Sequence, residues 1–352
     1  MSKYLNKRLN ALKPYTPGEQ PRDAKYIKLN TNESPYPPAP EVALVSRKET
    51  QMLNLYSDPT LKLLKEALAD RFGVSPENIS ASNGSDEILA FAFHAYGEEG
   101  FTGPALTYGF YPVFADFFGI DYKTVPMKED LSIDLDALTS SDRAIVLANP
   151  NAQTGLYIER EEIERLVSST DRIVIVDEAY VDFGGESAIP LTKKYKNLLV
   201  TGTFSKSRNL AGARIGFCVG DEELVSDIER LRFSFNPYNL NRISLAIGTE
   251  AVKNEEYFKN CTDRIIASRE SFKRKLSELG FSYTNSRANF VLAKKDGIEG
   301  KELYTRLREK GILVRYLGDE LIRDYVRITI GSEEEMKSLV LALKEILKEA
   351  EI

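Results

Sequence analysis

The chain has 352 residues, of which 42% are hydrophobic and 28% charged, and its formal net charge is −6. This length suffices for one large domain and a smaller one, and the acidic balance argues against a nucleic-acid or anionic-membrane partner. No apolar run reaches the roughly 18 residues of a membrane span, and the N-terminus lacks a signal-peptide core, so we expect a cytoplasmic protein. Two cysteines and one histidine form neither a disulfide framework nor a metal-ligand spacing.

Residues 1–35 are polar and interrupted by prolines, and we expect them to pack on the smaller domain. From residue 61 onward, helical patterns alternate with short, wholly apolar runs. The expected helices are 61–72, 86–96 and 158–169, and the expected strands are 79–83, 124–127, 144–149, 173–180, 198–202 and 215–220. Apolar strands separated by helices predict a mainly parallel sheet covered on both faces. In such sheets, ligands collect at the carboxyl ends of the strands.

The pattern changes after about residue 236. A long charged helix is expected over roughly 254–279, followed by short strands that alternate with one helical stretch. A final helix opens with Ser332 and Glu335 in the arrangement of a capping box. The sequence thus predicts three parts, namely the N-terminal segment 1–35, a large domain 36–236 and a small α+β domain 237–352.

Lys206 lies in a hydroxyl-rich turn directly after a buried strand, and Arg214 follows eight positions later. This placement suits an amine that forms a Schiff base with a carbonyl. Hydroxyls and a guanidinium beside it suit a phosphate dianion. An aldehyde combined with a phosphate indicates pyridoxal phosphate. The alternative for an isolated Ser-Lys pair is an ordinary surface lysine.

Two further stretches follow predicted strands and precede helices or turns. Gly84 allows a close turn, and the amides of Ser85 and Asp86 would form a helix N-terminus that suits a phosphate, although ordinary capping explains the same residues. Asp177 ends a buried strand, where a carboxylate needs a partner such as a protonated pyridine nitrogen. Tyr180, three residues on, could reach a ring hydroxyl. The alternative is that Asp177 caps the next turn.

Tyr108 and the turn NPNAQTG (149–155) also stand at strand ends. Tyr108 suits either a ring stacked on a flat heterocycle or packing in a core or interface. Turn chemistry alone explains the NPNAQTG stretch as well as a binding role does.

Together these stretches carry a resemblance. LNTNESPYP, YSDP, NGSDE, TYGFY, NPNAQTG, VDEAY, TFSKSRNLAGARIGF and VRITIGS resemble, in order and spacing, the fold-type I pyridoxal-phosphate-dependent aminotransferases, and among these the histidinol-phosphate aminotransferase family most closely. The match runs from about Tyr15 to Ile330. It implies an aspartate-aminotransferase-like α/β fold, in which a large domain has a mostly parallel seven-stranded sheet and a smaller domain is α+β. It also implies a homodimer with pyridoxal phosphate as cofactor and no metal.

The resemblance assigns a role to each matching residue. As catalytic residues, Lys206 would form the Schiff base, Asp177 would pair with the pyridinium nitrogen and Tyr180 would contact the ring hydroxyl. The other implied cofactor contacts are Ser85, Asp86, Tyr108, Asn151, Thr203, Ser205 and Arg214, with Tyr56 reaching the phosphate from the neighbouring subunit. The implied substrate contacts are Arg327, Arg315, Tyr15 and Asn32.

The sequence departs from the family in one turn. The common pattern is N-P-N-N-P-T-G, and its second adjacent Asn contacts the ring hydroxyl. Here Ala152 and Gln153 replace that Asn and the following Pro. Either Asn151 moves in to serve, or Tyr180 contacts the hydroxyl alone.

The resemblance implies transamination between histidinol phosphate and 2-oxoglutarate, with glutamate as the product, in histidine biosynthesis. Alternatives within the superfamily are a threonine-phosphate decarboxylase of cobalamin synthesis and a broad aromatic or aspartate-type aminotransferase. A non-catalytic regulator that binds pyridoxal phosphate is an alternative of another class. A dehydrogenase is disfavoured because no G-x-G-x-x-G follows a predicted strand.

Overall fold

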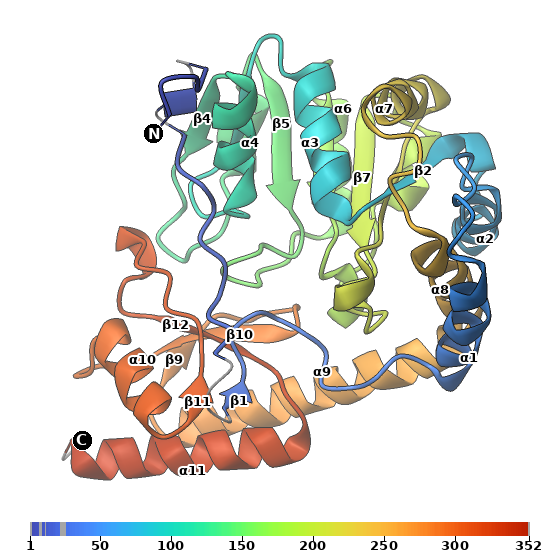
Figure 1. Ribbon diagram of the computed structural model, residues 1–352. Helices are drawn as coiled ribbons and strands as arrows, with labels where there is room; N and C mark the ends of the chain where they lie inside the picture. Colours follow the sequence, from blue (N-terminus) through green and yellow to red (C-terminus); the bar gives the residue numbers. More distant parts are fainter. Residues whose placement is uncertain (1, 7–8, 11, 22–25, 351–352) are drawn as a thin grey trace.

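A seven-stranded sheet forms the centre of the large domain in the computed structural model, which describes residues 2–6, 9–10, 12–21 and 26–350 (Figure 1). Its strands lie in the order β2 (Ile79–Ser82), β8 (Gly216–Val219), β7 (Leu198–Thr203), β6 (Val174–Asp177), β5 (Ala144–Ala148), β3 (Phe101–Pro104) and β4 (Tyr122–Val125). Within this sheet β8 alone points in the direction opposite to the other strands. The predicted mostly parallel seven-stranded sheet is therefore confirmed.

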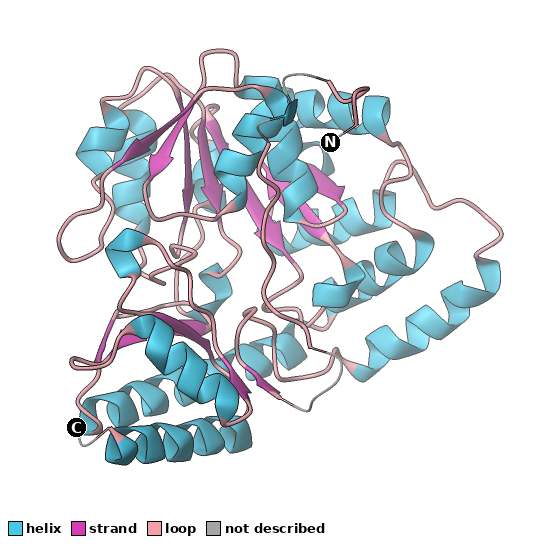
Figure 2. Ribbon diagram, turned by 60° about the vertical axis from the view of Figure 1, so that its left-hand side comes forward, coloured by secondary structure: helices cyan, strands magenta, loops and turns pink. Residues whose placement is uncertain are grey.

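The central strands are mostly apolar because helices cover both faces of the sheet (Figure 2). Along β6, Val174 and Val176 pack into one core cluster and Ile175 packs into another, as the two-residue period of a strand requires. The first face is covered by α2 (Lys62–Phe72), α6 (Arg160–Ser168) and α8 (Arg242–Lys253), and the second by α3 (Ser85–Tyr96), α4 (Phe110–Phe118) and α7 (Glu222–Phe235). Helices α1 (Pro40–Glu49) and α5 (Leu135–Thr139) complete the domain.

The small domain is built on a three-stranded antiparallel sheet. Strand β10 (Phe290–Lys294) lies between β12 (Val326–Thr329) and β9 (Ser282–Tyr283), and the helices are α9 (Glu255–Glu278), α10 (Gly300–Glu309) and α11 (Glu333–Glu349). The predicted capping box is confirmed, since Ser332 Oγ accepts from the Glu335 amide and the Glu335 carboxylate accepts from the Ser332 amide.

The N-terminal segment contributes β1 (Ile27–Lys28), which pairs in parallel with β11 (Ile312–Leu313) of the small domain. Residues 1, 7–8, 11 and 22–25 of that segment lie outside the described residues. Helix α9 begins against the large domain, where Phe258 is buried, and continues into the core of the small domain through Ile265 and Phe272 (Figure 1). The two domains thus share one long helix.

The domain limits proposed from the sequence remain a prediction, and α8 bears on them. This helix follows residue 236, yet Ile247 and Ala251 pack into the core of the large sheet. The strand expected at 124–127 begins instead at Tyr122 and ends before Pro126, which has no amide hydrogen to donate to a ladder.

Candidate active site

A cavity of about 460 Å³ lies at the carboxyl edge of the large sheet. Its wall is formed by residues at the ends of β5, β6 and β7, by the N-terminus of α3 and by the stretch that precedes α1. Many residues predicted for the site meet there, namely Lys206, Asp177, Tyr180, Tyr108, Ser85, Asp86, Thr203, Ser205 and Arg214. The parallel direction of β5, β6 and β7 explains this meeting, because their carboxyl ends share one edge.

Lys206 stands on the connection between β7 and β8. The Phe204 amide donates to the Ile215 carbonyl at 3.0 Å, and the Leu210 amide donates to the Phe204 carbonyl at 3.1 Å, so the connection is closed on itself. Lys206 Nζ donates to the Thr31 carbonyl at 3.2 Å and lies 5.7 Å from the centre of the Tyr180 ring. The amine is therefore held within the cavity.

Asp177 is the last residue of β6, and its side chain is buried. Its carboxylate accepts hydrogen bonds from Tyr111 Oη at 2.9 Å and from the Ala179 amide at 3.2 Å. Burial raises the pKa of Asp177 to about 6, although these two bonds oppose the rise. No cationic side chain in the described part of the chain pairs with this carboxylate. A protonated heterocyclic nitrogen would supply the missing positive charge, and the site fits pyridoxal phosphate in this respect.

One corner of the cavity suits a phosphate. Gly84 caps α3 with a φ of +83°, and a Cβ there would lie 2.5 Å from Arg214 Nη2. A Cβ on Gly216 would lie 2.1 Å from the Ser85 amide nitrogen. The two glycines therefore let the guanidinium and the first amides of the helix come close together. Those groups, with the Ser205 hydroxyl, make an anion-binding set of donors.

Asp86 binds two of the predicted site residues. Arg214 Nη2 donates to one of its carboxylate oxygens at 3.0 Å, and Tyr108 Oη donates to the other at 2.8 Å. Burial and the charge of Asp86 raise the pKa of Tyr108 well above its usual value. The phenol of Tyr108 is thus neutral, and its orientation in the cavity is fixed.

Tyr180 Oη accepts a hydrogen bond at 3.0 Å from Asn32 Nδ2. Asn32 has a φ of +56°, and its backbone amide donates to Thr329 Oγ1 at 3.0 Å. The carbonyl of Asn32 accepts from the Asn289 side chain at 2.9 Å. Asn32, in the N-terminal segment, therefore links Tyr180 of the large domain to Thr329 and Asn289 of the small domain.

Asn151 is not brought to the cavity. Its Nδ2 donates to the Leu106 carbonyl at 2.8 Å, and its Oδ1 accepts from the amides of Gln153 and Thr154 at 2.9 and 3.0 Å. These bonds close the turn and occupy both ends of the side chain. Ala152 lines the cavity in its place. Of the two alternatives set by the sequence, the geometry supports Tyr180 alone.

Of the substrate residues predicted from the resemblance, Arg327 and Arg315 belong to the small domain, whereas Tyr15 lies against helix α4 of the large domain. Arg327 donates to the Ala152 carbonyl at 2.8 Å and to Gln153 Oε1 at 3.2 Å. Arg315 instead donates to the carbonyls of the N-terminal segment at Thr16 and Pro17, at 2.9 and 3.2 Å. Tyr15, from the same segment, stacks on Phe110 with ring centres 4.3 Å apart.

Tyr56 does not reach the cavity of its own chain. Its side chain is 80% exposed and stacks on Tyr238 with ring centres 4.6 Å apart. Among the residues that sequence reasoning missed, Tyr111 binds Asp177, and Gln20, Thr31 and Glu33 line the cavity. The stretch TYGFY contains Tyr111, but nothing in the pattern separates it from a core aromatic residue.

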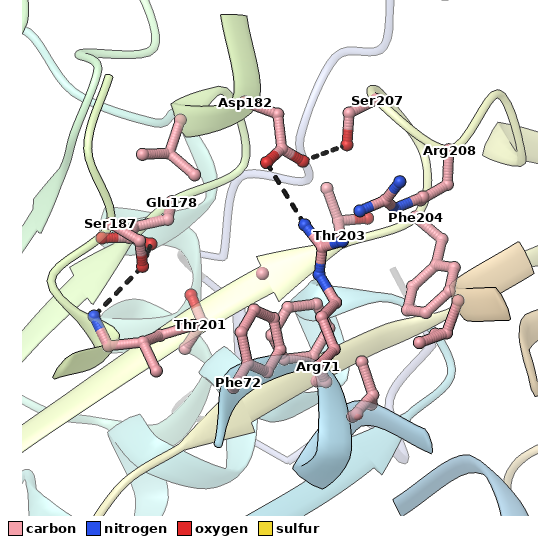
Figure 3. A pocket seen from close by; sticks show the side chains of 16 residues that line it. Arg71, Phe72, Glu178, Asp182, Ser187, Thr201, Thr203, Phe204, Ser207 and Arg208 are labelled. Carbon is pink, nitrogen blue, oxygen red and sulfur yellow. Dashed lines mark hydrogen bonds and ion pairs between the residues drawn. The ribbon is translucent and has the colours of Figure 1, made fainter. Parts of the chain in front are cut away.

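A second, smaller cavity of about 90 Å³ is lined in part by Ser207 and Arg208, the two residues that follow Lys206 (Figure 3). Ser207 donates to Asp182, and Asp182 also faces Arg71, with a distance of 3.8 Å between Arg71 Nη2 and Asp182 Oδ1. Arg71 pairs with Glu255 of α9, and Arg208 Nη2 reaches the same carboxylate at 2.8 Å. The two residues after Lys206 are thus held by an ion network that includes α9.

Both the fold and the main cavity are those of a fold-type I pyridoxal phosphate enzyme. A family model described as aminotransferase class I and II matches residues 24–343. A histidinol-phosphate aminotransferase of Brachyspira hyodysenteriae is 46% identical over 99% of this chain and 100% of its own length, and one of Chromohalobacter salexigens is 44% identical with the same coverage. The chain therefore belongs to the class I and II aminotransferases, which are pyridoxal-phosphate-dependent enzymes.

A solved structure agrees with this assignment. The histidinol-phosphate aminotransferase of Sinorhizobium meliloti, in complex with pyridoxal-5'-phosphate, superposes with a TM-score of 0.85 at 28% identity, covering 92% of this chain and 91% of that one. Within the described residues, no helix is both long enough and apolar enough to cross a bilayer.

Proposed function

We propose that the chain is a histidinol-phosphate aminotransferase that exchanges an amino group between histidinol phosphate and 2-oxoglutarate, with glutamate as the second product, in histidine biosynthesis. The observation that carries the proposal is the meeting of an amine, a buried carboxylate and an anion-binding corner in one cavity, at Lys206, Asp177 and Arg214. Identities of 46% and 44% over nearly the whole chain to proteins of that name support the choice of substrate.

The cofactor would be held at its ring nitrogen, its ring hydroxyl, the face of its ring and its phosphate. Asp177 would pair with the ring nitrogen, and Tyr180 would donate to the ring hydroxyl. Tyr108 would stack on the ring. The phosphate would be bound by the amides of Ser85 and Asp86, by Ser205 and by Arg214, with Thr203 supporting Ser205 through a hydrogen bond of 3.0 Å. Asn151 has no place in this set because its amide closes the turn.

When bound, pyridoxal phosphate supplies an aldehyde that condenses with amines and a ring that accepts an electron pair. Lys206 Nζ moves the proton of the carbon that bears the amino group, acting first as base and then as acid. Asp177 would stay ionised beside a cationic ring nitrogen and so would hold that nitrogen in its protonated form. Arg214 and the helix amides would hold the phosphate end of the cofactor and so keep its reacting end beside Lys206.

Arg327 would bind the anionic end of both substrates, since a guanidinium fork accepts either a phosphate or a carboxylate. Tyr15, Asn32 and Arg315 would shape the path to it, Asn32 through Tyr180 and Arg315 by holding the N-terminal segment in place.

A cytoplasmic homodimer completes the proposal, with Tyr56 reaching the phosphate in the partner's cavity. Large apolar side chains are exposed on α1, on α2, at the end of α7 and in the loop that carries Tyr56; they are Leu44, Leu53, Leu55, Leu63 and Phe235. A surface of this kind is typical of an interface. Light scattering coupled to gel filtration measures the mass, and a monomer would contradict the dimer.

The assay mixes purified holoenzyme with histidinol phosphate and 2-oxoglutarate and measures glutamate. We expect turnover with the wild type and a loss of at least about 100-fold in Lys206→Ala, because general acid–base catalysis is removed. The control incubates the enzyme with threonine phosphate alone. Release of carbon dioxide there, without glutamate formation in the first assay, would identify a decarboxylase instead.

A further inference from the structure

The guanidinium of Arg327 is held on one side only. Its Nη1 makes both of its hydrogen bonds, to the Ala152 carbonyl and to Gln153 Oε1. Its Nε is buried without a partner, and within the described residues the hydrogen bonds of the guanidinium are the two made by Nη1. The Nε–Nη2 edge is one that can bind a carboxylate or phosphate through two parallel bonds. Arg327 therefore presents an unpaired fork.

The side chain of Gln153 binds the remaining nitrogen of the guanidinium, Nη1. Its Nε2 donates to the Thr107 carbonyl at 2.9 Å, and its Oε1 accepts from Arg327 at 3.2 Å. The amide of Gln153 is itself fixed by Asn151 Oδ1 at 2.9 Å. Since Thr107 precedes Tyr108 and Arg327 belongs to β12, this one amide links the wall of the cavity to the small domain.

The two substitutions in the NPNAQTG turn make this link possible. The common family pattern has Asn and Pro at these positions, and a proline has no side-chain amide. Here Ala152 offers only its backbone carbonyl to Arg327, while the amide next to it comes from Gln153. We propose that Gln153 is a positioning residue for Arg327, which ties Nη1 so that the Nε–Nη2 edge stays free for the anionic end of the substrate.

The inference rests on the proposed function, in which Arg327 binds that anion. Gln153→Met keeps the length of the side chain and removes both hydrogen bonds. We expect its KM for 2-oxoglutarate to rise about tenfold, because one bond to a charged group orients the fork, with kcat within about twofold. Gln153→Glu keeps the acceptor but adds a negative charge next to Arg327. We expect a larger rise in KM, because the new carboxylate competes with the substrate anion.

Binding of succinate to the holoenzyme, measured by calorimetry, tests the same contact without turnover. We expect its Kd to rise in both variants by about the factor seen in KM. The matched control is Thr154→Val, which removes a hydroxyl that accepts from the Leu156 amide at 3.2 Å in the same turn and does not touch Arg327. We expect this variant to lower the melting temperature and to leave the Kd unchanged.

Three results would overturn the inference: a wild type that does not bind succinate, a Kd unchanged in Gln153→Met and Gln153→Glu, or an equal loss of binding in Thr154→Val. Failure of the proposed function looks different. Succinate would still bind in a Gln153-dependent way, while histidinol phosphate would give no glutamate. If Gln153→Met fails to fold, Gln153→Glu decides by the same two measurements.

Discussion

Replacing Glu178 with Gln should stabilise the protein, and more so as the pH rises. Glu178 directly follows Asp177 but lines the second cavity, where it is 5% exposed. It accepts hydrogen bonds from Ser187 Oγ and from the Ala188 amide, both at 2.5 Å. Burial raises the pKa of Glu178 from 4.5 to about 8, and these two bonds only partly oppose the rise.

The direction of the pH effect follows from this raised pKa. Between pH 4.5 and about 8 the folded protein keeps the proton that the unfolded chain gives up, so the stability linked to Glu178 is complete at low pH and is lost as the pH rises. At about 1.4 kcal/mol for each pKa unit, the loss is about 1 kcal/mol at pH 5 and about 3 kcal/mol at pH 7. A Gln at this position does not titrate. Its Oε1 can accept from the Ala188 amide, and its Nε2 can donate to Ser187 Oγ.

Urea unfolding of the two holoenzymes across this pH range measures the difference in the free energy of unfolding. We expect the advantage of Glu178→Gln over the wild type to grow by about 2 kcal/mol from pH 5 to pH 7. Glu98→Gln, at an exposed site, is the control and should run parallel to the wild type. Parallel curves for Glu178→Gln would refute the reasoning, because they would mean that Glu178 is already ionised in the folded protein.

Three further changes test the site. Asp177→Asn should weaken cofactor binding at least about tenfold, because a neutral amide does not attract a cationic ring nitrogen. In a fluorescence titration, the affinity of the wild type for the cofactor should decrease when the pH is lowered below about 6, because Asp177 takes up a proton. The affinity of the variant should not change in this way. Gly84→Ala should displace Arg214 and lower the affinity by a similar factor, whereas Gly311→Ala, which also has a positive φ but meets no atom within 4 Å, should leave it unchanged. Arg208→Met should cost about 3 kcal/mol in urea unfolding, and a further Glu255→Gln change should add less than it does alone, because the two residues share one ion pair.

The sequence predicts the sheet and the main groups of the site because their signals are local. Continuous apolar runs that end in polar residues mark β5, β6 and β7, and Asp177 and Lys206 follow from their positions at those ends. Strand β3 has no such signal, since its sequence FTGP contains two residues that strands avoid. Its place is set by hydrogen bonds to β4 and β5 rather than by its own composition.

The environment of a charged or amide side chain could not be predicted in the same way. Arg and Glu side chains are mostly exposed in proteins, yet Arg208 and Glu178 are buried by partners that lie far away in the chain or around a turn, such as Glu255 for Arg208. Asn151 has an amide that satisfies either a ligand or its own turn equally well. Which of the two it satisfies depends on the position of the Leu106 carbonyl, which belongs to another strand connection.

The connection between β7 and β8 carries both Lys206 and Arg214, and its two ends are neighbours in an antiparallel ladder, with Thr203 opposite Gly216. Lys206 and Arg214, to which the proposed function gives the reactive amine and a phosphate contact, therefore sit on a single closed loop of fixed length. Inserting or deleting even one residue there would shift one group relative to the other, whereas the outer loops of the domain face no such demand. Engineering of this enzyme should leave the spacing between these two residues untouched and seek new specificity in the turn around Gln153.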